Sequence, residues 1–208
     1  MRGLLLLIIL SFNFAYADEP YQFRPDYWSK GLHLTAGGGV NTTYIDSNDR
    51  FGNIGYGLNG STDLSYYLTN RFAVDWSSNV KFNRIQNYLV WDTLITFGVR
   101  YRIKEYYIRA FGGRAPTVIF FEGNPPKEYK ASNATRLQYD GPVYGFSVGK
   151  MMQAKSGLIW FLESSATLQR LKDRQGIKMN GQVPVIVSRE KDTSTLVSLY
   201  FMVGVLIF

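Results

Sequence analysis

Long segments in which apolar and polar residues alternate one by one limit the folds open to this chain more than any other feature. From Phe72 to Asn83, one side reads Phe, Val, Trp, Ser, Val and Phe, and the other reads Ala, Asp, Ser, Asn, Lys and Asn. Successive side chains point to opposite faces of a β-strand, so a period of two indicates strands with one apolar and one polar face. Such segments are longer than the five or six residues usual for strands of soluble proteins.

Eight segments of this kind are expected, and the connections between them differ in length. They span about 31–45, 54–68, 71–85, 88–103, 106–121, 142–152, 157–171 and 194–208. Short turns are predicted at 69–70, 104–105 and 153–156, and longer loops at 46–53, 122–141 and 172–193, with 86–87 as a short exception. Short turns at one rim and long loops at the other are typical of membrane β-barrels. Loops of about 20 residues would be unusual inside a compact soluble domain.

The direction of the apolar face separates a membrane barrel from a soluble sandwich or lipocalin-like barrel, because both alternate. Three features favour an apolar exterior. The polar faces carry Gly, Ser and Thr with charges of both signs, the apolar faces carry Trp and Tyr, and the last strand ends at Phe208. After Tyr16 there is no apolar run of the roughly 20 residues that a spanning helix needs. The prediction is an all-β fold, an eight-stranded antiparallel transmembrane β-barrel.

The N-terminus has the features of a secretory signal peptide rather than of a membrane anchor. Arg2 precedes an aliphatic run, and Ala15-Tyr16-Ala17 is a small-x-small cleavage site. The run is too short to span a bilayer comfortably. We therefore expect a signal peptide at 1–17, a periplasmic segment at 18–30 and the barrel at 31–208.

Composition removes several classes of chemistry. The chain has no cysteine and one histidine, which excludes thiol catalysis, Cys-based metal sites and multi-His metal sites. No cofactor or metal is predicted. The net charge of +7 is compatible with nucleic acid, but anionic lipid is the expected partner of an exported protein, and no nucleic acid is predicted.

The whole predicted barrel resembles the small OmpA/OmpX/OmpW-like outer-membrane proteins. The resemblance rests on the signal peptide, eight alternating strands, unequal loops and the terminal segment 196–208. It implies an outer-membrane location, a monomer, and a C-terminal signal read by the barrel assembly machinery. That signal would comprise Tyr200, Met202, Gly204, Leu206 and Phe208. The opposite face of the same strand is also apolar, so the sequence leaves open which face meets lipid.

Six charged residues fall on inward faces in this register. They are Asp63, Asp75, Arg100, Arg102, Arg109 and Glu163. Charges in a narrow lumen are costly unless they are paired and hydrogen-bonded. We therefore predict an ion-pair plug, with the alternative that Arg102 and Arg109 point into water at a rim.

The last predicted loop and its flanks are basic. They carry Arg170, Lys172, Arg174, Lys178, Arg189 and Lys191 against Asp173, Glu190 and Asp192. Because Arg and Lys suit phosphate oxygens, this rim is predicted to contact lipopolysaccharide phosphates. A solvated loop is the alternative. The apolar run Val183–Val187 suggests strand pairing beyond the membrane, with an edge open to a partner strand.

Three functions are compatible with such a barrel, and the fold does not choose among them. The first is a structural, adhesive or surface-interaction role, which we favour. The second is a channel for small or apolar solutes, in which Gly112-Gly113 could mark a bend in the fifth strand. The third is a lipid A-modifying enzyme, for which His33 would need Ser77 and Asp75. Neither a His-x-Ser pair nor a matching motif is present, so no enzyme is predicted.

Overall fold

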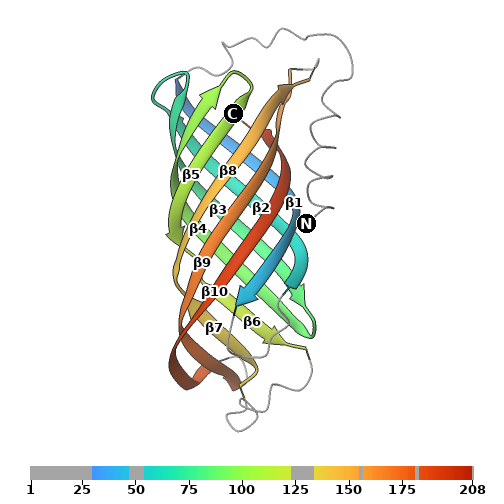
Figure 1. The fold of residues 1–208 in the computed structure, drawn as a ribbon, viewed down its shortest axis with the longest axis vertical. Helices are drawn as coiled ribbons and strands as arrows, with labels where there is room; N and C mark the ends of the chain where they lie inside the picture. The colour runs from blue at the N-terminus through green and yellow to red at the C-terminus, as the bar shows by residue number, and fades with distance from the viewer. Residues whose placement is uncertain (1–29, 47–53, 123–133, 155–156, 181–182, 208) are drawn as a thin grey trace.

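A computed structural model describes residues 30–46, 54–122, 134–154, 157–180 and 183–207, and these residues form one closed ring of antiparallel strands (Figure 1). The predicted signal peptide 1–17, most of the segment 18–30 and Phe208 lie outside them. The strands are β1 Gly31–Asp46, β2 Ile54–Tyr67, β3 Phe72–Ile85, β4 Tyr88–Ile103, β5 Tyr106–Arg114, β6 Thr117–Phe121, β7 Arg136–Asp140, β8 Pro142–Gln153, β9 Ile159–Asn180 and β10 Val183–Leu206.

Eight staves make up the ring, because two of them consist of two strands each. β5 and β6 both pair with β4 in one continuous register, and β7 and β8 both pair with β9. The interruptions fall at Ala115-Pro116 and Gly141-Pro142, where proline has no N–H to donate to a ladder. Pairing of β9 with β10 and of β10 with β1 closes the circle. The predicted eight-stranded antiparallel barrel is confirmed, although the fifth and sixth staves are divided.

The outer face of the ring is apolar and the inner face is largely polar. On β3, Val74, Trp76 and Phe82 are exposed, while the alternating residues from Ala73 to Asn83 are buried. The same division holds along β1, β2 and β4. None of the described residues forms a helix long and apolar enough to cross a membrane. Exposed apolar surface that runs around a ring of strands is what a barrel in lipid requires, since soluble proteins rarely expose so much.

The two ends of the ring differ, and we call them the turn end and the hairpin end. The turn end carries the short connections at 68–71, 104–105 and 154–158, together with the start of β1 and the end of β10. The hairpin end carries β6, β7 and the tips of β9 and β10, at the bottom of Figure 1. The predicted long loop at 172–193 is wrong, because β9 runs to Asn180 and β10 starts at Val183, and the two remain paired.

A β-bulge changes the faces within this hairpin. Asp173 has a φ of 52°, and the pairing of β9 with both neighbours shifts near this residue. Lys172 and Asp173 are exposed, whereas Arg174 is buried. An extra residue reverses the alternation of everything that follows it. Arg174, predicted on the exposed rim, is therefore turned away from solvent.

The interior is layered along the barrel axis, which simple alternation did not indicate. An apolar cluster at the hairpin end is formed by Ile45, Ile85, Val90, Ile119, Ala134, Leu137, Tyr139, Leu171 and Leu196. A second one at the turn end is formed by Tyr67, Ala73, Tyr107, Met151, Ile159 and Phe161. Polar and charged side chains occupy the space between them. We call these the outer apolar cluster and the inner apolar cluster.

Candidate functional site

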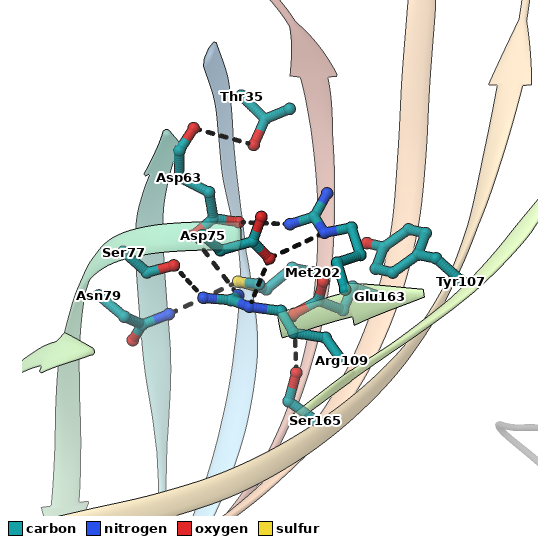
Figure 2. Close-up of polar contacts among 11 residues, drawn as sticks. Thr35, Asp63, Asp75, Ser77, Asn79, Tyr107, Arg109, Glu163, Ser165 and Met202 are labelled. Carbon is teal, nitrogen blue, oxygen red and sulfur yellow. Dashed lines mark hydrogen bonds and ion pairs between the residues drawn. The ribbon is translucent and has the colours of Figure 1, made fainter. Parts of the chain in front are cut away.

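Four charged residues from four consecutive strands meet inside the barrel (Figure 2). Asp63 lies on β2, Asp75 on β3, Arg100 on β4 and Arg109 on β5, and all are buried. The Nε atoms of both arginines lie 3.0 Å from Asp75 Oδ2. Asp63 lies 3.7 Å from Arg100 Nη2 and 3.6 Å from Arg109 Nη1. The two carboxylates therefore bridge two guanidinium groups that are cross-strand neighbours.

Glu163 takes a different place from the predicted one. Its carboxylate accepts hydrogen bonds from the Tyr107 hydroxyl at 2.7 Å and from Ser165 Oγ at 2.9 Å. The Tyr107 ring also lies under the Arg100 guanidinium, 4.7 Å from ring centroid to Cζ. A Cβ at position 149 would overlap that ring, so Gly149 makes room for it. Glu163 thus borders the four-residue cluster through Tyr107.

Arg102 does not join the cluster, although it was predicted to. It is buried at the turn end, where its Nε donates to the Lys104 carbonyl at 3.0 Å. Arg109, for which a position in bulk water was the alternative, is buried in the cluster and also donates to Ser77 Oγ.

A second polar group fills the lumen nearer the hairpin end. Lys81 Nζ donates to Thr167 Oγ1 at 3.0 Å and lies 5.0 Å from the centroid of the Tyr200 ring. Asp92 accepts from Thr117 Oγ1 at 2.6 Å. The sequence-based prediction did not include these residues. Their signal was present, however, because Lys81 and Asp92 both fall on inward faces and are directly paired across β3 and β4.

The described residues line a small cavity at the centre of the lumen. A cavity of about 10 Å³ lies beside Asp63, Asn79, Arg109 and Tyr200, which is room for about one water molecule. An eight-stranded ring encloses an interior that side chains can fill, and here they do so with layers of opposite polarity.

The structure shows which residues of the terminal strand β10 face the interior and which face outward. Tyr200, Met202 and Gly204 of the predicted assembly signal point into the barrel, and Leu206 is half-buried on the same side. Their odd-numbered neighbours Val197, Leu199, Val203, Val205 and Ile207 are exposed on the outside. Phe208, the last residue of that signal, lies outside the described residues.

His33, the one histidine, is an interior residue at the turn end. Its ring packs edge-on against Tyr67, with centroids 4.8 Å apart. Asp75 and Ser77, the partners that an enzyme reading would need, are bonded to Arg100 and Arg109.

The predicted basic rim divides into three parts. Arg170 and Lys172 are exposed on the outside of the barrel, and Lys178 and Arg189 are exposed on the hairpin beyond it. Arg174 is buried. The side chain of Lys191 lies outside the described part of the chain.

Comparison with known proteins places the fold. No family model and no curated protein matches the sequence. Among solved structures, the attachment invasion locus protein Ail of Yersinia pestis matches with a TM-score of 0.52 at 10% identity, over 86% of this chain and 99% of Ail. Neisserial surface protein A gives 0.48 at 9% identity, over 84% and 96% of the two chains. AlkL in lipid bilayers gives 0.47 at 14%, over 91% and 96%.

The likeness to Ail and the closed ring together define the class of the protein. The chain has the fold of the small eight-stranded outer-membrane β-barrels, and the predicted resemblance is confirmed at that level. An identity of 10% carries no more than the fold.

Proposed function

We propose that this protein is an exported outer-membrane barrel with a closed lumen, which acts through its hairpin end as a surface-interaction or adhesive protein. The observation that carries the proposal is the length of the β9–β10 hairpin. Pairing of β10 with β1 stops at Thr195 and Asp46, whereas β9 and β10 stay paired as far as Asn180 and Val183. With short turns toward the periplasm, this hairpin extends outward from the cell.

The chemistry of the hairpin supports an interaction role. Val183 is 63% exposed, and Met179, Val185 and Ile186 are also exposed. Basic side chains lie beside them at Lys178 and Arg189. Apolar side chains on a strand outside the membrane are costly in water and mark a surface that a partner covers.

Replacing Val183, Val185 and Ile186 together by serine tests this proposal. Adhesion of cells displaying the variant to surfaces coated with extracellular-matrix or serum proteins should fall to that of cells without the protein, since the apolar contact is lost. The matched control is Leu158→Ser, which removes an exposed apolar residue at the turn end. Undiminished adhesion of the triple variant, at equal surface amounts, would rule out the hairpin as the contact surface.

Passage of small apolar solutes is the second candidate. Pro116 lies at the break of the fifth stave and Pro142 at that of the sixth, and neither has a backbone N–H to donate. Leu94, Ala115 and Val143 form an apolar patch inside the wall there. A solute could leave sideways into the membrane at that point. Entry of an apolar fluorescent dye into cells should then depend on the protein, and should fall when Pro116 and Pro142 are replaced by valine.

We further propose that insertion uses the outer-membrane assembly machinery, and that the barrel has no catalytic role. The packing of His33 against Tyr67 and the engagement of Asp75 by two arginines support the second point. Lipid A from cells with and without the protein should carry the same acyl chains.

A further inference from the structure

The outside of the barrel changes from apolar to basic along one line near the hairpin end. On β9 the outward residues Leu168, Arg170 and Lys172 follow each other toward that end, and all are exposed. On β8 the exposed rings of Phe146 and Tyr144 come first. Outward-facing apolar side chains mark the hydrocarbon region of a membrane, so the first cations beyond them lie at the level of lipid headgroups.

Cations from the fifth and seventh staves approach this line from either side of the sixth stave. Lys172 of β9 is the backbone partner of Asp140 on β7. Arg114 of β5 forms an ion pair with the same Asp140 from the other side. Arg170 lies beside the adjoining Gly141, close enough that a Cβ there would overlap the Arg170 carbonyl. Because only one stave separates β5 from β9, the three cations are spread over roughly 10 Å.

Among the described side chains, the acids near these three cations do not neutralise them. Asp140 and the exposed Asp173 next to Lys172 are two carboxylates against three positive charges. The backbone partner of Arg170 on β10 is Thr195, and among the described residues Arg170 has no carboxylate partner. Arg114 remains 76% exposed despite its ion pair. Within the described part of the chain, the site therefore keeps a net positive charge and free guanidinium donors, immediately above a surface suited to acyl chains.

We propose that Arg114, Arg170 and Lys172 bind a phosphate group of lipopolysaccharide in the outer leaflet. The inference rests on the proposed orientation, with the hairpin end outward. Guanidinium groups match phosphate oxygens in two-point contacts, and lysine adds a compact charge. Asp140 forms an ion pair with Arg114 and does not itself contact the phosphate, so its negative charge opposes binding of the anion. This set differs from the basic rim expected from the sequence, since Arg114 joins it and Arg174 is buried.

The test measures lipid retained by the full-length protein in bilayers of three compositions: phosphatidylcholine with intact lipopolysaccharide, with dephosphorylated lipopolysaccharide, or with phosphatidylglycerol. The wild type should retain intact lipopolysaccharide at least about tenfold better than the dephosphorylated form, as loss of charge-assisted contacts predicts. Arg170→Gln with Lys172→Gln should reduce that retention by about tenfold. Arg84→Gln, an exposed arginine paired with Glu122 elsewhere on the same end, is the control and should change it little.

Asp140→Asn separates phosphate binding from an ion pair that only supports the fold. Removing a negative charge beside a bound phosphate should tighten retention about two- to fivefold. Retention that falls in this variant would overturn the proposal, and so would equal retention of intact and dephosphorylated lipopolysaccharide. Equal retention of phosphatidylglycerol would mean a general anionic surface and would also overturn it. Adhesion through the hairpin is measured separately, so either proposal can fail without the other.

Discussion

At the scale of single residues, the buried charges are held by mutual pairing. Asp75 contacts both arginines at 3.0 Å, while Asp63 lies 3.6–3.7 Å from them. Inward projection of these residues follows from alternation, which made their meeting predictable. The roles of Glu163 and Arg102 did not follow, because alternation gives the direction of a side chain but not the height at which it meets its neighbours.

Replacing Asp75 by asparagine should destabilise the folded barrel by about 3–5 kcal/mol, because two buried guanidinium groups lose their nearest counter-charge. The free energy of unfolding is measured in urea, with the loss of heat-modifiable migration on a gel as the signal for unfolding. Glu122→Gln is the control, since its pair with Arg84 is exposed and should contribute at most about 1 kcal/mol. Similar losses of unfolding free energy for both variants would show that the buried cluster contributes no more to stability than an exposed ion pair.

At the scale of elements, each strand is oriented by the difference in polarity between its two faces, with the apolar face outside and the polar face inside. On β4, Phe97 is 67% exposed on the outside, whereas Arg100 is buried. Alternation predicted this for the first four strands. It did not predict the length of β9 and β10, because charged residues and the bulge at Asp173 interrupt their pattern.

An arginine on the outer face of β4 should be costly in proportion to its depth in the membrane. Phe97→Arg, near the middle of the strand, should reduce stability by about 2–4 kcal/mol and lower the amount of inserted protein. Ile103→Arg, at the turn end of the same face, should cost only about 0–1 kcal/mol. Membrane fractionation and heat-modifiable migration report both effects. Equal insertion of the two variants would contradict a lipid-facing outer surface.

At the scale of the whole molecule, side chains fill the lumen in more than one layer. The four-residue cluster lies between the outer and inner apolar clusters, so charge pairing is not the only layer along the axis. An eight-stranded ring is narrow enough for such layers to fill it, and we propose that they leave no continuous water path.

We therefore expect no reproducible conductance steps from the purified protein in a planar bilayer. The same should hold when Asp63, Asp75, Arg100 and Arg109 are all replaced by alanine, provided that the variant still inserts, because the apolar clusters at both ends remain. Steps that appear in the quadruple variant alone would identify the charged cluster as the sole closure. Steps in the wild type would favour the channel function.

The sequence by itself determined the number of staves, the inward and outward sets of the first four strands and the inside-out polarity. It could do so because the two-residue period of a strand is a local property. Only the tertiary structure decided which charges pair, that Arg174 turns inward, and that apolar clusters lie at both ends. The order of the fifth, sixth and seventh staves also places Arg114 and Lys172 on either side of Asp140, although they are 58 positions apart in the chain. These features depend on which strands become neighbours and in what register, and a pattern within one strand does not contain that information.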